Sequence, residues 1–219
     1  MNSELMITED GSHTLFVPAI DECYHSTHGA VQESMHIFIE AALKQCVKKE
    51  IRVLEIGFGT GLNAFLTMIE AERSDKNIHY TSLEKYPVEV AKALQLNYPE
   101  AVLDGSRNGF ELLHTSIWGE EIQIVSNFWL TKIEADFTQF NFNEMFDVVY
   151  FDAFSPEKQP EMWSQELFGK IFIQCNSGAI LTTYCAKGVV RRAMQSAGFN
   201  VERLPGPPGK RQILRSTKI

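Results

Sequence analysis

The sequence has little that would place the protein in a membrane or in an oxidising compartment. None of its apolar runs approaches the ~20 residues needed to cross a bilayer, and residues 1–10 carry acids instead of a secretion signal. The four cysteines are scattered without a Cys-x-x-Cys pair. Although Cys23, His25 and His28 lie close in sequence, their spacing matches no common zinc pattern. We therefore expect a cytoplasmic protein with reduced thiols and no metal site.

An overall basic charge is also lacking, because the formal net charge is −8. This excludes a general nucleic-acid coat protein. The charge is unevenly distributed, however: residues 180–219 carry +7, which leaves −15 for residues 1–179. Such asymmetry indicates either a localised surface that faces phosphates or a solvated C-terminal face. The basic residues of greatest interest are Lys187, Arg191, Arg192, Lys210 and Arg211.

Repeats, linkers and low-complexity tracts are absent, and a 44% hydrophobic chain of 219 residues can bury one core of ordinary size. We expect a single domain over residues 1–219, in which residues 1–48 form an N-terminal extension and a first helix (34–48) that cover the ligand site. Strands alternate with helices in the pattern of a parallel α/β sheet with helices on both faces, and the last two strands add an antiparallel strand. The expected strands are 51–56, 78–83, 121–125, 128–135, 146–151, 179–184, 199–204 and 212–215, and the main helices are 62–73, 88–97 and 187–197.

A glycine turn between the first of these strands and its helix is the central motif, with Gly57, Gly59 and Gly61 at every second position. A dinucleotide fingerprint needs its third glycine at position 62, which is leucine here, and no Gly-Lys-Ser/Thr follows as in a phosphate loop. Glu55 precedes the turn and would repel a phosphate, so we expect it to favour a cationic ligand. S-adenosylmethionine carries an ammonium and a sulfonium group and no phosphate, which fits this turn.

Two further acids follow strands that end at the same sheet edge, where ligands of such folds bind. Glu84 is placed to accept hydrogen bonds from both ribose hydroxyls, and Asp136 from the adenine amino group. Asp152 follows the strand 146–151 and is flanked by Phe151, Phe154 and Trp163. A carboxylate in such surroundings is a candidate to orient or deprotonate a nucleophile. The alternative is that Asp152 caps a helix or structures its loop.

Several stretches together resemble a known family, namely residues 53–63, 82–87, 134–137, 150–163 and 183–211. The most specific are Phe-Asp-Ala-Phe-Ser-Pro-Glu-Lys-Gln-Pro-Glu-Met-Trp (151–163) and Val-Val-Arg-Arg-Ala-Met-Gln-Ser-Ala-Gly-Phe (189–199). They resemble the methyltransferase domain of MnmC, the tRNA 5-methylaminomethyl-2-thiouridine methyltransferase, and in particular its free-standing form, MnmD. We expect no FAD-dependent oxidase domain in this protein, so another enzyme would have to supply the aminomethyl substrate. The loop reads Asp-Ala-Phe-Ser where the bifunctional form typically has Asp-Gly-Phe-Ala.

This resemblance implies a class I, Rossmann-like fold and transfer of a methyl group from S-adenosylmethionine to the exocyclic amine of 5-aminomethyl-(2-thio)uridine at the tRNA wobble position. Asp152 would be the catalytic residue. The cofactor would be held by Glu55, Gly57, Gly59, Gly61, Asn63, Glu84, Asp136 and Phe137. The substrate, including the anticodon arm, would be held by Phe154, Trp163, Lys187, Arg191, Arg192, Lys210 and Arg211.

Three other functions remain open at the level of sequence. A methyltransferase of a small-molecule or protein amine would share every feature except the basic C-terminal region. An NAD(P)-dependent oxidoreductase is weakened by the misplaced third glycine, and a non-catalytic binding module by Asp152. The sequence does not indicate the oligomeric state.

Overall fold

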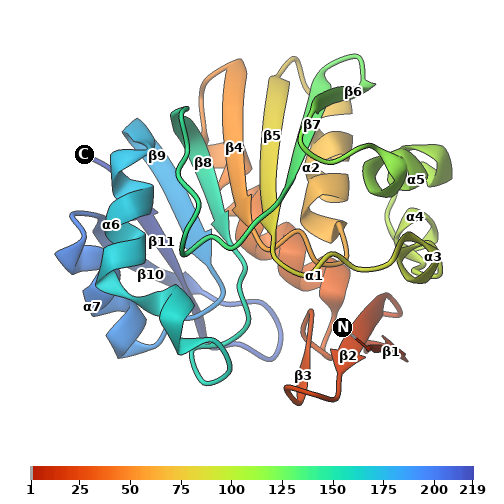
Figure 1. The fold of residues 1–219 in the computed structure, drawn as a ribbon, viewed down its shortest axis with the longest axis horizontal. Coiled ribbons are helices and arrows are strands. Elements are labelled where there is room, and N and C mark those ends of the chain that lie inside the picture. Colours follow the sequence, from red (N-terminus) through yellow and green to blue (C-terminus); the bar gives the residue numbers. More distant parts are fainter. Residues whose placement is uncertain (1) are drawn as a thin grey trace.

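The computed structural model describes residues 2–219, whose central element is an eight-stranded sheet (Figure 1). Its order is β10 (Asn200–Pro205), β11 (Gln212–Thr217), β9 (Cys175–Thr183), β8 (Phe146–Phe151), β4 (Glu50–Ile56), β5 (Asn77–Glu84), β7 (Phe128–Glu134) and β6 (Glu121–Val125). Strands β9, β8, β4, β5 and β7 are parallel. The mostly parallel α/β sheet is therefore confirmed, with β11 running antiparallel between β9 and β10, and β6 antiparallel at the other edge.

Both faces of the sheet are covered by helices, as the sequence predicts (Figure 1). Along a strand successive side chains point to opposite faces, and in β8 Val148 and Tyr150 join one apolar cluster while Val149 and Phe151 join the other. The first cluster packs under α2 (Leu62–Glu72) and α5 (Arg107–Thr115), and the second under α6 (Gln165–Ile173) and α7 (Gly188–Ser196). Three shorter helices lie in the connections after β5 and β8: α3 (Val90–Ala93), α4 (Tyr98–Ala101) and the 3-10 helix η3 (Pro160–Trp163).

The N-terminal region forms a small antiparallel sheet of β1 (Glu4–Ile7), β2 (His13–Val17) and β3 (Glu22–Cys23). The helix predicted over 34–48 is different in the structure. An α-helix, α1 (Ala30–Ser34), continues as a π-helix, η1 (Met35–Glu40), and a separate 3-10 turn, η2 (Leu43–Gln45), follows. The wider π turn allows three consecutive apolar residues, 37–39, to be buried together against the sheet.

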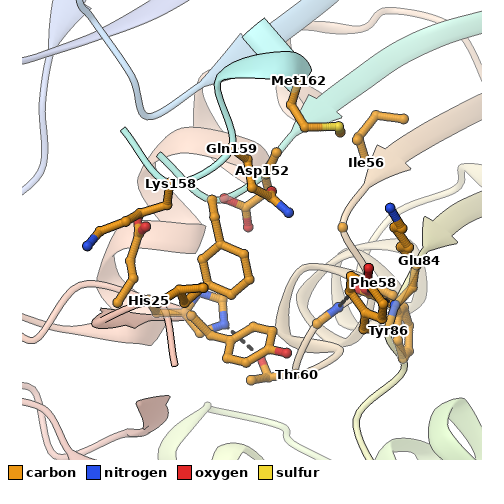
Figure 2. A pocket seen from close by; sticks show the side chains of 18 of the residues that line it. His25, Ile56, Phe58, Thr60, Glu84, Tyr86, Asp152, Lys158, Gln159 and Met162 are labelled. Atoms are coloured by element: carbon orange, nitrogen blue, oxygen red, sulfur yellow. Dashed lines mark hydrogen bonds between the residues drawn. The ribbon is translucent and has the colours of Figure 1, made fainter. Parts of the chain in front are cut away.

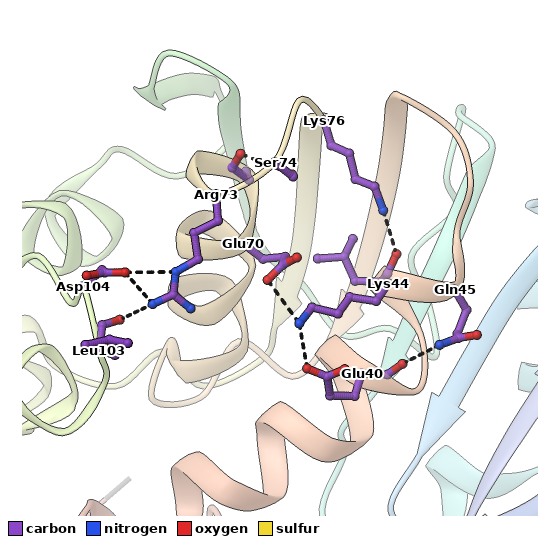
Figure 3. Close-up of polar contacts among 11 residues, drawn as sticks. Glu40, Lys44, Gln45, Glu70, Arg73, Ser74, Lys76, Leu103 and Asp104 are labelled. Carbon is purple, nitrogen blue, oxygen red and sulfur yellow. Dashed lines mark hydrogen bonds and ion pairs between the residues drawn. The ribbon is translucent and has the colours of Figure 1, made fainter.

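Polar contacts attach this N-terminal helical region to α2 and to the loops beside it (Figure 3). Lys44 Nζ lies 2.7 Å from Glu40 Oε1 and 3.6 Å from Glu70 Oε2 on α2. Lys76 Nζ donates to the Cys46 carbonyl at 2.9 Å. These contacts tie the segment between η1 and β4 to α2 and to the residue that precedes β5.

Candidate active site

A cavity of about 810 Å³ lies at the carboxyl ends of the parallel strands (Figure 2), within the roughly 300–1,000 Å³ range typical of ligand sites. Its walls come from the segments that follow β4, β5, β7 and β8, from the N-terminal residues 20–27, and from Lys210. In Figure 2, Glu84, Tyr86 and Phe58 lie on one side, and Asp152, Gln159 and Lys158 on the other. The open sheet thus brings together residues that are far apart in sequence, as expected for this edge.

The glycine turn allows unusually close backbone contacts. Gly57 has φ +96°, and a Cβ added there would lie 2.8 Å from the carbonyl oxygen of Asp152. Gly59 has φ +50° and would place a Cβ 2.8 Å from Tyr24 Cδ1. Both line the cavity. Gly61, predicted to bind the cofactor, instead lies outside the cavity lining and packs against His114, where a Cβ would be 2.8 Å from Nε2.

Glu84 ends β5 with its carboxylate held at the cavity wall. One oxygen accepts the Gly59 N–H at 2.9 Å, and the other accepts the Tyr86 N–H at 2.8 Å. Each carboxylate oxygen has a second lone pair. The carboxylate is therefore oriented and still able to accept two hydroxyl groups, such as those of a ribose.

Asp136 follows β7 and also lines the cavity, next to Phe137. Its Oδ1 accepts from the backbone and hydroxyl of Thr138, and Oδ2 lies 2.8 Å from Lys85 Nζ. The bond from Lys85, together with those from Thr138, lowers the pKa of Asp136 to about 2. Phe137 is only 3% exposed and gives this part of the wall an apolar face. An acceptor beside an aromatic face suits a purine base.

The prediction that Glu55 faces the ligand is wrong. Glu55 is 0% exposed and does not line the cavity. Because side chains alternate along β4, Glu55 shares the face of Ile51 and Val53, which is packed under α2. Its Oε2 accepts the Ser82 hydroxyl at 2.6 Å. Glu55 therefore cannot supply the charge that the sequence argument assigned to it.

Asp152 lies just beyond β8 on the cavity floor. Its Oδ2 accepts the side-chain amide of Asn63 at 2.8 Å, and Asn63 itself lines the cavity from the first turn of α2. Burial raises the pKa of the Asp152 carboxyl to about 7, against the opposing effect of the bond from Asn63. Glu33 raises this pKa further and Lys210 lowers it. A carboxyl that titrates near neutrality in a cavity is equipped for proton transfer.

The N-terminal segment closes the cavity through contacts that the sequence did not reveal individually. Glu22 accepts both the backbone N–H and the hydroxyl of Ser155, at 3.1 and 3.0 Å. Tyr24 packs edge-on against Phe154, with ring centroids 5.1 Å apart. His25 Nε2 lies 2.6 Å from the Thr60 hydroxyl in the glycine turn (Figure 2). The density of polar and aromatic groups in residues 21–28 was the available signal, but their partners are distant in sequence.

Of the two aromatic residues predicted to bind substrate, only Phe154 lines the cavity. Trp163 is 5% exposed and lies outside the cavity lining, packed against Phe151 and Tyr184. Its indole N–H donates to the Phe154 carbonyl at 2.9 Å. The expected substrate contact at Trp163 is therefore replaced by support of the loop that carries Phe154. Tyr184, in contrast, does line the cavity.

The basic residues divide into two groups. Lys210 lies in the cavity wall, with Nζ 2.9 Å from Glu33 Oε1 and 5.0 Å from the centre of the Tyr184 ring. The other four lie outside the cavity lining: Lys187, Arg191 and Arg192 on or beside α7, and Arg211 on the loop before β11. Lys187 is paired with Glu157. Lys210 thus belongs to the site itself, and the others to the surface.

The part of the chain that the structure describes contains no cluster of three or more His, Cys, Asp or Glu side chains arranged to hold a metal ion. Its four cysteines are free. None of the described helices is both long enough and apolar enough to cross a membrane.

Comparison with known proteins identifies the family to which this geometry belongs. A family described as S-adenosyl-L-methionine-dependent methyltransferase matches residues 110–219. The chain belongs to this family. S-adenosylmethionine is accordingly the cofactor of this methyltransferase, and the NAD(P)-dependent alternative is set aside. The match covers β7, β8 and the C-terminal strands, including Asp136 and Asp152.

Curated relatives cover nearly the whole methyltransferase chain. The tRNA 5-methylaminomethyl-2-thiouridine biosynthesis bifunctional protein MnmC of Pseudoalteromonas atlantica is 29% identical over 97% of this chain. The protein of the same name from Cupriavidus necator is 31% identical over 90% of it. These alignments cover 33% and 32% of the two relatives, so the chain spans about a third of their length.

Solved structures agree with this assignment. The crystal structure of MNMC2 from Aquifex aeolicus matches 99% of the methyltransferase chain, and 70% of its own, with a TM-score of 0.80 and 25% identity. Spermidine synthase from Thermotoga maritima has a TM-score of 0.59 over 99% of the chain and 72% of its own, with 10% identity. The second likeness reflects the shared fold alone.

Proposed function

We propose that this methyltransferase acts in the cytoplasm, where it moves the methyl group of S-adenosylmethionine to the exocyclic amine of 5-aminomethyl-(2-thio)uridine at the wobble position of tRNA. The observation that carries the proposal is Asp152, a carboxylate on the cavity floor whose pKa is raised to about 7. Asn63 occupies one of its oxygens, and among residues 2–219 no group donates a hydrogen bond to the other. The names of the curated relatives indicate tRNA as the substrate.

S-adenosylmethionine fits the half of the cavity formed by the ends of β4, β5 and β7. Glu84 would accept the ribose hydroxyls, Asp136 and Phe137 would contact the adenine, and Gly57 and Gly59 leave room for the ligand to approach the backbone. The cofactor supplies an electrophilic methyl group when it is bound. The residues of this chain determine which acceptor reaches that methyl and in which protonation state.

The charge of the cavity wall favours an amine as the acceptor. The acids that line it are Asp21, Glu22, Glu33, Glu84, Asp136, Asp152 and Glu161, against the three bases Lys85, Lys158 and Lys210. Such a wall attracts cations and repels phosphates. We therefore place only the modified base of the nucleotide inside the cavity, which requires an unstacked wobble base. The phosphates remain outside, near Lys187, Arg191, Arg192 and Arg211.

The amine must lose a proton before it can act as a nucleophile, because an alkylammonium has no free lone pair. Asp152 would accept that proton through its unoccupied oxygen, while Asn63 keeps the carboxylate oriented. Tyr184 donates its hydroxyl to the Ala153 carbonyl at 2.9 Å, which fixes its ring at the cavity wall. The rings of Tyr184 and Phe154 would contact the cationic amine both before it loses its proton and after it has received the methyl group.

Replacing Glu84 with glutamine should weaken S-adenosylmethionine binding about 10- to 100-fold, because a charge-assisted hydrogen bond to a ribose hydroxyl is lost. Isothermal titration calorimetry with S-adenosylmethionine measures the effect. Glu134→Gln, at an exposed strand end outside the cavity, is the matched control and should bind normally. Equal affinities for the two variants would remove Glu84 from the cofactor site.

Replacing Arg191, Arg192 and Arg211 together with glutamine should weaken tRNA binding and reduce its salt dependence. Each arginine that no longer neutralises a phosphate should reduce the slope of log affinity against log salt by about one. Filter binding across a salt series measures the slope. Arg73→Gln, an exposed arginine paired with Asp104, is the control. If the triple variant keeps the wild-type affinity and slope, tRNA does not contact this surface.

The proposed function is tested by offering labelled S-adenosylmethionine and a choice of acceptors. Transfer should be strongest to tRNA that carries the wobble 5-aminomethyl group. Unmodified tRNA should accept no methyl group at that position. Preferred transfer to free polyamines or protein lysines would instead make the enzyme a methyltransferase of small-molecule or protein amines.

A further inference from the structure

Glu55 is an acid buried in apolar surroundings, with no role in lining the cavity. It is 0% exposed and shares its face of the sheet with Val53, Tyr80 and Tyr150. Among residues 2–219 no Lys, Arg or His forms an ion pair with it. Ionising a carboxyl in such a place is costly, and a buried acid without a cation usually stays neutral.

Polar side chains lie between Glu55 and Asp152. Ser82 donates to Glu55 Oε2 at 2.6 Å. The Asn63 amide donates to Asp152 at 2.8 Å. Burial raises the pKa of Glu55, and Asn63 and Tyr80 lie near enough to its carboxyl to oppose that rise. Asn63 is 3% exposed and lines the cavity beside Asp152.

Three polar atoms in this cluster have no hydrogen-bond partner among the described residues: Glu55 Oε1, Asn63 Oδ1 and Tyr80 Oη. When Glu55 is ionised, Glu55 Oε1 and Asn63 Oδ1 can only accept hydrogen bonds, and the Tyr80 hydroxyl is the one group of the three that carries a hydrogen. Ionised Glu55 adds no hydrogen to this group, whereas neutral Glu55 adds one. A proton on Glu55 therefore reduces the number of buried acceptors without a donor.

We propose that Glu55 is held as a neutral carboxylic acid and that, together with Asn63, it positions Asp152 as the only ionised carboxylate of this buried pair. As long as Glu55 keeps its proton, the cluster of Ser82, Glu55, Asn63 and Asp152 carries one negative charge at most. That charge lies at the end that faces the cavity. The role of Asp152 as a base rests on the proposed function, whereas the neutral state of Glu55 does not depend on it.

The electrostatic surroundings agree with this order of ionisation. Burial raises the pKa of Glu55 to about 8; the bond from Ser82 opposes this, and the charge of Asp152 adds to it. Burial raises the pKa of Asp152 to about 7, so Asp152 ionises first. The other titratable groups that face the pair are Tyr80 and Tyr150 at Glu55, and Glu33, Lys210 and Tyr184 at Asp152.

The first test is the pH dependence of thermal stability for wild type and Glu55→Gln. An acid whose pKa is higher in the folded state stabilises the fold fully below its unfolded pKa, and that stability is lost as the pH rises through the folded value. The wild-type Tm should therefore fall relative to that of Glu55→Gln between about pH 5 and about pH 8. Glu111→Gln, an exposed acid on α5, should run parallel to wild type. Parallel curves for Glu55→Gln would overturn the proposal.

The second test is the acidic limb of the pH profile of kcat/KM. Replacing neutral Glu55 with neutral glutamine should leave the midpoint pH of the acidic limb unchanged. If Glu55 were charged, its removal would lower that midpoint by about one pH unit. Asn63→Asp removes the amide donor and adds a carboxyl, so it should move the limb upward by about one unit. A downward shift in Glu55→Gln contradicts the proposal. If wild type methylates no tRNA amine, the proposed function fails, and the thermal test still decides the state of Glu55.

Discussion

Replacing Asp152 with asparagine should lower the rate of methyl transfer by about 10²–10⁴-fold, the usual contribution of a general base. Asparagine keeps the acceptor for the Asn63 amide but cannot take a proton. S-adenosylmethionine binding should persist, because Glu84 and the glycine turn are unchanged. Single-turnover kinetics and calorimetry measure the two properties separately. Asp75→Asn, a surface acid paired with Lys49, should keep wild-type turnover.

The pH profile adds a signature that a loss of folding cannot imitate. Because the ionised form of Asp152 is the base and its pKa is raised to about 7, wild-type kcat/KM should fall about tenfold per unit below that pH. The limb should be absent in Asp152→Asn. By the same linkage, Asp152 costs stability above its folded pKa, so the variant should melt no lower than wild type at about pH 8. Near-normal turnover would contradict the catalytic assignment.

Replacing Gly57 with alanine should reduce turnover about 10²-fold or more. The added Cβ would lie 2.8 Å from the Asp152 carbonyl oxygen, so either the glycine turn or the Asp152 segment has to move. A displacement of about 1 Å in an active site is enough for a loss of this size. The positive φ of +96° adds backbone strain of about 1–2 kcal/mol. Steady-state kinetics and chemical denaturation measure the two effects.

Gly119→Ala separates strain from the steric effect. Gly119 has a similar φ of +84°, but an added Cβ meets nothing within 4 Å. This variant should lose comparable stability and keep its activity. If Gly57→Ala also keeps its activity, the close approach between the glycine turn and Asp152 is not needed for catalysis.

The fold could be predicted from the sequence because its strongest signals are local. Apolar strands followed by helices at regular spacing indicated the parallel sheet, and the acids at three strand ends indicated the positions of Glu84, Asp136 and Asp152. Since these strands are parallel, their carboxyl ends meet at one edge whatever the details of packing. The cavity forms at that edge.

The errors in the predicted site have physical reasons of different kinds. The direction of Glu55 follows from the alternation of side chains along β4 and was available in the sequence. The placement of Trp163 behind the loop that carries Phe154 could not be predicted from the sequence, because it depends on packing against Phe151 and Tyr184. The bond between Glu22 and Ser155 joins residues 133 positions apart, and no local pattern encodes such a pair. No local pattern in the sequence reveals that the Lys210 side chain lies in the cavity wall, paired with Glu33.

The central claim is most directly tested by nucleoside analysis of tRNA after reaction. Substrate tRNA carrying 5-aminomethyl-2-thiouridine is incubated with the enzyme and isotope-labelled S-adenosylmethionine, digested, and examined by mass spectrometry. We expect one labelled methyl group on the exocyclic nitrogen of the wobble nucleoside with wild type, and about 10²-fold less label or lower with Asp152→Asn in the same short reaction time. Label on a ring atom or a ribose, or equal label with the variant, would contradict the account.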